Sequence, residues 1–200
     1  MTSSDPLPFL FDAALLAGGR SRRMGRDKAF LDSDGQLLWR RQVGVLSACR
    51  PVRLFLAARS DQPWEHLDES LIRVDDPEGE DIGPIGAIGR CLALANRPLL
   101  VMAVDLPNMT ADFVLQGLLR KSELGARGVI PRVGEQFEPL CALYVPQMLP
   151  LLQTAIAAGK YALQPLARSF VGEGIATAVD LVADELPLFH NANTPADWQG

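Results

Sequence analysis

The 200-residue sequence has few of the residues that build metal clusters or disulfide frameworks. It contains three cysteines, Cys49, Cys91 and Cys141, and two histidines, His66 and His190. No cysteine lies in a CxxC pair, so neither a zinc site nor a disulfide framework is indicated. Two distant histidines are too few for a zinc site or a Ser-His-Asp set. Isolated cysteines in apolar surroundings are typical of buried thiols in a reducing cytoplasm.

Long apolar runs and an excess of positive charge are also absent. No run reaches the roughly 18 residues of a membrane span. The apolar stretch 9–16 has no basic segment before it and contains Asp12, so a secretory signal is not indicated. The formal net charge is −5, so neither nucleic acid nor a membrane is an expected partner. Length and a 48% hydrophobic content fit one globular domain over residues 1–200.

Short apolar runs alternate with longer amphipathic segments along the chain. Strands are predicted over residues 9–16, 52–57, 71–74, 99–104, 128–131, 140–144 and 175–180. Helices are predicted over residues 36–48, 85–95, 111–119, 146–157 and 163–170. This alternation predicts an α/β fold with a mostly parallel central sheet. The predicted strands at 52–57 and 99–104 lack polar alternation, which favours strands covered on both faces.

A glycine-rich basic loop follows the first predicted strand. Gly18 and Gly19 let a ligand approach the bare backbone. Five basic side chains follow within nine residues: Arg20, Arg22, Arg23, Arg26 and Lys28. Successive backbone N–H groups together with cations form an anion cradle. The loop therefore indicates a triphosphate site, and a solvated basic turn is the less favoured alternative in an otherwise acidic chain. The phosphate-binding motifs GxxxxGK[ST] and GxGxxG are both absent.

Two further loops follow predicted strands and are expected at the same sheet edge, because ligands bind at the carboxyl ends of parallel strands. Asp76 and the Gly83-Pro84-Ile85-Gly86 segment come after the strand at 71–74, and Asp105 follows the strand at 99–104. Asp105 is the candidate Mg²⁺ ligand, since a carboxylate facing a triphosphate can share the ion with waters and phosphate oxygens. A turn or helix-capping aspartate is its alternative.

The other candidates are assigned by their charge or their size. Lys28 and Arg23 are expected to neutralise the leaving pyrophosphate, with solvated side chains as the alternative. Asp76 could hold a nucleobase, a ribose or a metal, although Asp-Asp-Pro is also an ordinary turn. Gly83 permits close backbone approach, or else opens a tight turn before a helix.

Several of these segments together resemble a known family. Leu16-Ala17-Gly18-Gly19, Arg23-Met24-Gly25 and Asp27-Lys28 resemble the signature of nucleotidyltransferases of the molybdenum cofactor guanylyltransferase type. Four later segments agree in order, at 83–86 (GPIG), 105–107 (DLP), 139–144 (PLCALY) and 191–195 (NANTP). The resemblance spans about residues 12–198, and the last two segments narrow it to the guanylyltransferase subgroup.

The resemblance implies a Rossmann-like three-layer sandwich and transfer of GMP from Mg-GTP to the terminal phosphate of molybdopterin or Mo-molybdopterin, with release of pyrophosphate. Other molybdenum cofactor biosynthesis proteins and acceptor molybdoenzymes are the implied partners. Carried over by position, the residues that would contact the nucleotide are Leu16, Ala17, Gly18 and Asp76. Lys28 would contact the phosphates, and Asp105 would hold Mg²⁺. The pterin would be contacted by Asn191 and Asn193.

One position departs from the family pattern. Relatives often carry an asparagine just after the second strand, where this chain reads Leu56-Ala57-Ala58-Arg59. A cytidylyltransferase acting on the same pterin and a sugar-phosphate nucleotidyltransferase therefore stay open as alternatives within the enzyme class. A non-catalytic nucleotide-binding module is the alternative from another class.

Overall fold

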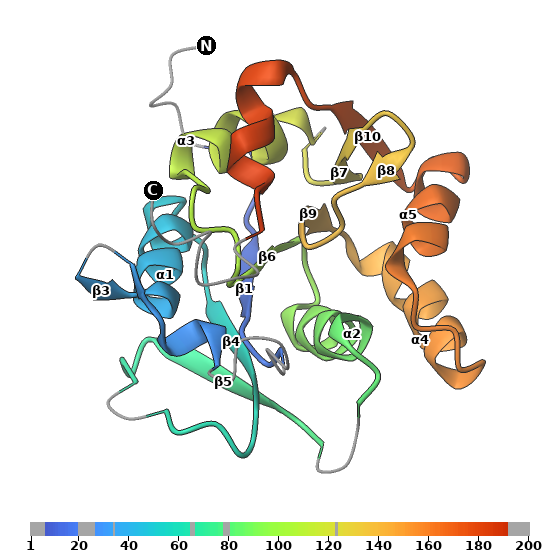
Figure 1. Cartoon of the computed structure of the whole chain (residues 1–200). Helices are drawn as coiled ribbons and strands as arrows, with labels where there is room; N and C mark the ends of the chain where they lie inside the picture. The colour runs from blue at the N-terminus through green and yellow to red at the C-terminus, as the bar shows by residue number, and fades with distance from the viewer. Residues whose placement is uncertain are drawn as a thin grey trace.

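An eight-stranded sheet forms the centre of the molecule (Figure 1). The structure is a computed structural model, and it describes residues 7–19, 27–33, 35–64, 67–77, 81–122 and 124–191. The strands of the sheet run in the order β10-β7-β9-β6-β1-β4-β5, and β8 pairs with β7. Their bounds are β1 Asp12–Leu16, β4 Leu54–Arg59, β5 Leu71–Asp76, β6 Leu99–Ala103, β7 Gly128–Val133, β8 Gln136–Phe137, β9 Cys141–Tyr144 and β10 Ala176–Asp180.

The sheet is mostly parallel, as the alternation of strands and helices predicts. β1 pairs in parallel with β4 and β6, β4 with β5, and β7 with β10. β8 and β9 are the exceptions, since β9 lies antiparallel between β6 and β7, and β8 is antiparallel to β7. The connection from β7 to β9 is too short for a crossover helix, and short connections join antiparallel neighbours. β8, which was not predicted from the sequence, forms a hairpin with β7 through Gly134 at φ +56°.

Helices cover both faces of the sheet. Their bounds are α1 Leu38–Ala48, α2 Pro84–Ala95, α3 Ala111–Phe113, α4 Leu149–Ala157 and α5 Leu163–Gly172, with short 3-10 helices η1 Lys28–Phe30, η4 Pro146–Met148 and η5 Ala183–Phe189. α1 begins two residues later than predicted, because residues 36–37 form β3 (Gln36–Leu37) and pair with β2 (Asp32–Ser33).

The predicted helix at 111–119 is less regular than expected. It starts where the sequence predicts, since the Thr110 hydroxyl accepts a hydrogen bond from the Phe113 N–H at 3.2 Å. The helix then continues as a π-helical turn, η2 Val114–Leu118, and ends as the 3-10 turn η3 Leu119–Lys121. A Cβ at Gly117 would lie 2.7 Å from the Phe113 ring, so the glycine leaves room for that ring.

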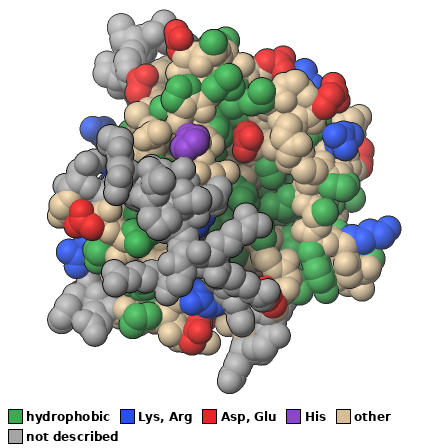
Figure 2. All heavy atoms as spheres, in the orientation of Figure 1, with side chains coloured by type: hydrophobic (Ala, Val, Ile, Leu, Met, Phe, Trp, Pro, Cys, Tyr) green, Lys and Arg blue, Asp and Glu red, His purple; other side chains and the backbone are tan. Residues whose placement is uncertain are grey.

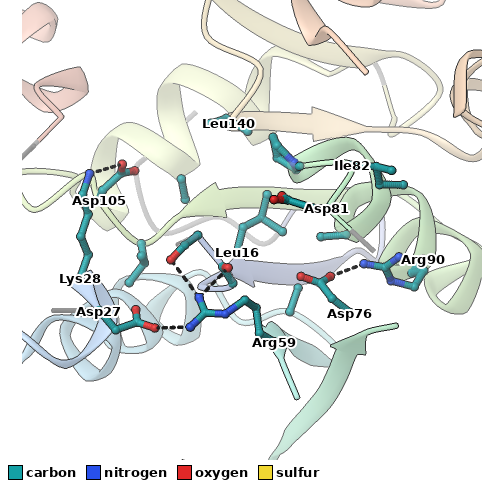
Figure 3. A pocket seen from close by; sticks show the side chains of 18 residues that line it. Leu16, Asp27, Lys28, Arg59, Asp76, Asp81, Ile82, Arg90, Asp105 and Leu140 are labelled. Carbon is teal, nitrogen blue, oxygen red and sulfur yellow. Dashed lines mark hydrogen bonds and ion pairs between the residues drawn. The ribbon is translucent and has the colours of Figure 1, made fainter. Parts of the chain in front are cut away.

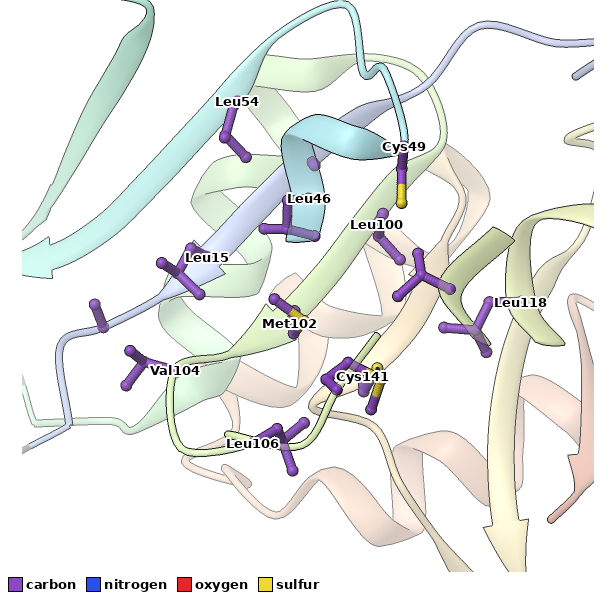
Figure 4. Packing of buried hydrophobic residues seen from close by; sticks show 14 of the residues in the cluster. Leu15, Leu46, Cys49, Leu54, Leu100, Met102, Val104, Leu106, Leu118 and Cys141 are labelled. Atoms are coloured by element: carbon purple, nitrogen blue, oxygen red, sulfur yellow. Dashed lines mark hydrogen bonds between the residues drawn. The ribbon is translucent and has the colours of Figure 1, made fainter. Parts of the chain in front are cut away.

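Alternate residues of the strands enter two separate cores. Leu15 and Leu100 belong to the core under α1, α3 and η5, which Figure 4 shows from close by. Ala14 and Leu99 belong to the core under α2, α4 and α5. The three layers that the resemblance implies are therefore present, with the sheet between two layers of helices.

All three cysteines are buried, and none is paired. Burial raises the pKa of the Cys49 and Cys91 thiols to about 12. Among the described side chains of the face in Figure 2, Lys and Arg are scattered and form no continuous basic surface. Within the described residues, no helix combines the length and the apolar character that a membrane crossing needs.

Candidate active site

A cavity of about 530 Å³ opens at the carboxyl ends of β1, β4, β5 and β6 (Figure 3). Its volume lies in the usual range for small-molecule sites. Seven of the predicted site residues line it: Leu16, Gly18, Gly19, Lys28, Asp76, Gly83 and Asp105. The three loops that the sequence analysis assigned to one sheet edge therefore meet at one cavity.

Strand pairing brings these residues together. Asp76 is the last residue of β5 and lies opposite Arg59, the last residue of β4. Asp105 comes two residues after β6, and the neighbouring Val104 donates its N–H to the Leu16 carbonyl oxygen at 3.1 Å. Leu16 is the last residue of β1, so the loops after β1 and β6 leave the sheet side by side.

The remaining predicted residues are placed differently. Ala17 is buried beside the cavity, and its N–H donates to the Ala57 carbonyl oxygen at 2.8 Å. Asn191 is exposed after η5 and is not among the residues that line the cavity. Arg23 and Asn193 lie outside the described residues. The roles of Asn191, Asn193 and Arg23 stay predictions.

Gly18 is at the closest approach between the loop and the end of β5. A Cβ there would lie 2.9 Å from Asp76 Oδ2 and 3.4 Å from the Arg59 backbone nitrogen. Because real Cβ contacts are longer than 2.9 Å, any other residue would displace the Asp76 carboxylate. Gly83 is required for another reason, since it precedes Pro84 at φ +70°, a conformation that side chains disfavour.

Ion pairs span the cavity from one end to the other. Lys28 Nζ lies 3.1 Å from Asp105 Oδ2 at one end (Figure 3). Arg90 pairs with Asp76 at the other end. Arg59 Nη2 lies 3.1 Å from the Asp27 carboxylate between them. The paired side chains are mostly shielded from water, so these contacts are stronger than ordinary surface salt bridges.

Four charged residues of the lining were not predicted as site residues: Asp27, Arg59, Asp81 and Arg90. Asp27 precedes Lys28 and Arg59 ends the second predicted strand region, but only the tertiary structure shows that the two side chains pair. Arg90 lies on α2, and no local pattern connects it with Asp76. The described lining holds carboxylates and cations in nearly equal number, which suits a site that exchanges internal partners for ligand charges.

The carboxylates suit a cation that arrives with a ligand. Within the described residues, no group of three or more His, Cys, Asp or Glu side chains could hold a metal ion. Mg²⁺ is commonly held through one or two carboxylates together with substrate phosphates and waters. Asp105 fits that role, because its side chain is 25% exposed and lines the cavity.

Known proteins match both the sequence and the fold. The MobA-like NTP transferase domain matches residues 13–175. A probable molybdenum cofactor guanylyltransferase from Mycobacterium marinum is 34% identical and covers 92% of this chain and 89% of its own. Another of the same name, from Synechococcus elongatus, is 33% identical and covers 94% and 96%.

Two solved structures show the same fold at low sequence identity. The molybdopterin-guanine dinucleotide biosynthesis protein A from Archaeoglobus fulgidus has a TM-score of 0.70 at 23% identity, covering 94% of each chain. A 2-C-methyl-D-erythritol 4-phosphate cytidylyltransferase from Thermus thermophilus has a TM-score of 0.66 at 17% identity, covering 93% and 94%. At these identities the two likenesses show a shared fold.

Proposed function

This chain belongs to the MobA-like NTP transferase family, and we propose that it transfers GMP from GTP to molybdopterin or Mo-molybdopterin, forming molybdopterin guanine dinucleotide and pyrophosphate. The observation that carries the proposal is one cavity lined by the Gly18-Gly19 backbone, Lys28 and Asp105. Relatives that are 33% and 34% identical over most of the chain are named for this activity.

In this proposal the nucleotide lies along the cavity with its phosphates beside Lys28. The bare backbone of Gly18 and Gly19 allows close approach, next to Leu16 and Ala17. Asp76, at the opposite end from Lys28 in Figure 3, contacts the nucleoside. Gly83, which lines the cavity directly before α2, allows close backbone approach of the nucleotide. Asn191 and Asn193 are proposed for the pterin.

The chemistry is an in-line displacement at phosphorus. A terminal phosphate oxygen of the pterin forms a bond to the α-phosphorus of GTP while the bond to pyrophosphate breaks. Both reactants are anions, so Lys28 and Arg23 are needed to lower their repulsion and to stabilise the departing charge. The attacking phosphate monoester is already largely ionised near pH 7, so no general base is required. Mg²⁺ held by Asp105 and the phosphates would add charge neutralisation when bound.

The same proposal treats residues 1–200 as one nucleotidyltransferase domain that acts in the cytoplasm. The unpaired, buried cysteines agree with a reducing compartment. Other molybdenum cofactor biosynthesis proteins and acceptor molybdoenzymes are the proposed partners, since the product must reach an enzyme that uses it.

A nucleotide panel tests the proposal. Thermal unfolding is measured with GTP, CTP, ATP and UTP, each with and without Mg²⁺. A ligand at 100 times its Kd stabilises by about 2.7 kcal/mol, or roughly 5–10 °C for a chain of this size. Turnover is then followed as pyrophosphate release and product mass, with molybdopterin, Mo-molybdopterin and sugar phosphates as acceptors. Transfer of GMP to the pterin is expected.

The other outcomes of this panel select the alternatives. Preference for CTP would indicate a cytidylyltransferase, which the absence of an asparagine at 56–59 leaves open. Transfer to a sugar phosphate alone would change the acceptor. Binding without pyrophosphate release from any acceptor would indicate a non-catalytic nucleotide-binding module.

Substitutions at the cavity test the assigned roles. Lys28→Ala is expected to lower turnover by about 10²–10³, the usual effect of removing one electrostatic contact to the transition state. Asp105→Ala is expected to abolish the Mg²⁺-dependent activity without unfolding the protein. Near-normal turnover of the first variant, or unchanged Mg²⁺ dependence of the second, would remove that residue from the mechanism.

A further inference from the structure

The end of β4 and the turn after it contact both parts of the chain that carry the proposed phosphate-binding residues. Arg59 donates from Nη1 to the carbonyl oxygens of Gly18, at 2.9 Å, and Gly19, at 3.1 Å. It donates from Nη2 to Asp27 Oδ2 at 3.1 Å (Figure 3). One guanidinium therefore holds the end of β1 and the start of η1 at a fixed separation.

Gln62 repeats this connection from the same segment. Its Nε2 donates to the Ala17 carbonyl oxygen at 2.8 Å and to Asp27 Oδ2 at 2.6 Å. Its Oε1 accepts from the Arg59 backbone N–H at 2.8 Å. Gln62 is only 4% exposed, and a buried amide with both ends bonded has one allowed orientation.

The guanidinium of Arg59 is occupied by protein partners. Four of its five N–H donors are used, on Gly18, Gly19, Asp27 and, through Nε at 2.9 Å, Asp61. One N–H donor on Nη2 takes part in none of these bonds, so bidentate binding of a phosphate by this guanidinium would require at least one of them to be given up. The geometry therefore favours a positioning role for Arg59 over direct contact with the ligand.

Asp27 passes this restraint to Lys28. Its Oδ2 accepts from both Arg59 and Gln62, while its Oδ1 accepts from the Ala29 N–H at 3.3 Å and caps η1. Lys28 is the first residue of η1, and its Nζ lies 3.1 Å from Asp105 Oδ2. The direction in which Lys28 leaves the backbone thus depends on how Asp27 is held.

We propose that Arg59 and Gln62 are positioning residues for nucleotidyl transfer, which hold Asp27 and thereby place Lys28 against the reacting phosphates. The inference rests on the proposed function. It assigns a role to the segment in which this chain lacks the asparagine that relatives often carry. The restraint needs the forked guanidinium and the amide, since a charge alone cannot reach the Gly18, Gly19 and Asp27 oxygens together.

A double-mutant cycle tests the inference. Arg59→Gln and Gln62→Leu are each expected to lower kcat/KM by about 10- to 100-fold, the scale of an ångström-sized misplacement of a catalytic group. In a Lys28→Ala background the same substitutions should cost less than about threefold, because residues acting through one group are not additive. Arg59→Lys should be nearly as impaired as Arg59→Gln.

Two further measurements separate positioning from folding. Arg132→Gln is the matched control, since Arg132 forms a comparable forked pair with Asp180, 2.6 Å from Nε to Oδ1, and does not line the cavity. It should leave kcat/KM unchanged. Hydrogen exchange of the amides at 28–31 should accelerate in Arg59→Gln and Gln62→Leu and remain unchanged in Arg132→Gln.

Each opposing outcome has a distinct meaning. Equal losses with and without Lys28, or full activity of Arg59→Lys, would overturn positioning and assign Arg59 a direct electrostatic role. Unchanged kcat/KM and exchange in both Arg59→Gln and Gln62→Leu would overturn the inference and leave the proposed function intact. A wild-type protein that transfers no nucleotide would instead refute the proposed function itself.

Discussion

Gly18→Ala is the most direct test of how the cavity is packed. The added methyl group would lie 2.9 Å from Asp76 Oδ2, about half an ångström inside ordinary contact distance. The backbone atoms nearby are farther, at 3.4 and 3.5 Å, so the Asp76 carboxylate is the group that must move. Moving it breaks the pair with Arg90, in which both side chains are about one-quarter exposed.

The magnitude follows from that broken pair and from a neighbouring control. Loss of a partly exposed ion pair costs about 1 kcal/mol, whereas replacing glycine by alanine stabilises by about 0.4–1 kcal/mol through the unfolded chain. Among the residues that the structure describes, a Cβ at Gly19 meets nothing within 4 Å, so Gly19→Ala should show only the second effect. The two variants should therefore differ by about 1 kcal/mol, or roughly 2–4 °C in Tm for a chain of this length.

Thermal and urea unfolding of four proteins decide the matter. They are Gly18→Ala, Gly19→Ala, and the same two substitutions in an Asp76→Ala background, where the methyl group meets no carboxylate. The difference between the two glycine variants should disappear in that background. Equal stability of Gly18→Ala and Gly19→Ala, or a difference that persists without Asp76, would refute the proposed contact.

Two other predictions concern groups away from the cavity. Arg53→Gln should cost about 3–5 kcal/mol in urea unfolding, because, of the ion-pair partners in the described part of the chain, it leaves the fully buried Asp12 carboxylate only Arg97, at 3.7 Å. Asp12→Asn should cost less, about 1–2 kcal/mol, since water can reach the Arg53 left behind, and the reverse order would contradict this reasoning. Burial raises the pKa of Glu138, so the free energy of unfolding falls as pH rises through that pKa. Glu138→Gln should therefore stabilise the protein at pH 7 and lose its advantage below about pH 4. A difference in unfolding free energy between this variant and the wild type that does not change with pH would contradict this reasoning.

The strands could be predicted because local composition decides them. Residues 54–56 and 99–102 are apolar without alternation, and only a strand covered on both faces buries every side chain of such a run. The start of α3 was equally local, since Thr110 caps it through its own hydroxyl. The direction of β9 could not be predicted in the same way. It depends on the connection from β7, which contains β8 and is too short for a crossover helix, so β9 returns antiparallel to β7.

The cavity shows the same division between local and long-range causes. Gly18, Lys28, Asp76 and Asp105 were recognisable because each follows a predicted strand or lies in a short loop motif. Arg90 was not, because its partner Asp76 lies 14 residues away on another element. The contact between Arg90 and Asp76 depends on the register between β4 and β5 and on the path of α2. No local sequence pattern predicts either of these.

The pairing of Lys28 with Asp105 explains how an acidic protein can hold an anionic substrate. The side chains of Lys28 and Asp105 are 14% and 25% exposed, and their ion pair holds both charges beside the cavity before a nucleotide binds. Because the charges are already in place, binding requires little reorganisation. Under the proposed function, phosphate oxygens would compete with Asp105 for Lys28, and Asp105 would then be the carboxylate available to hold Mg²⁺. The pair thus prepares two opposite charges for one ligand, and the restraint on Asp27 matters because it fixes where that exchange takes place.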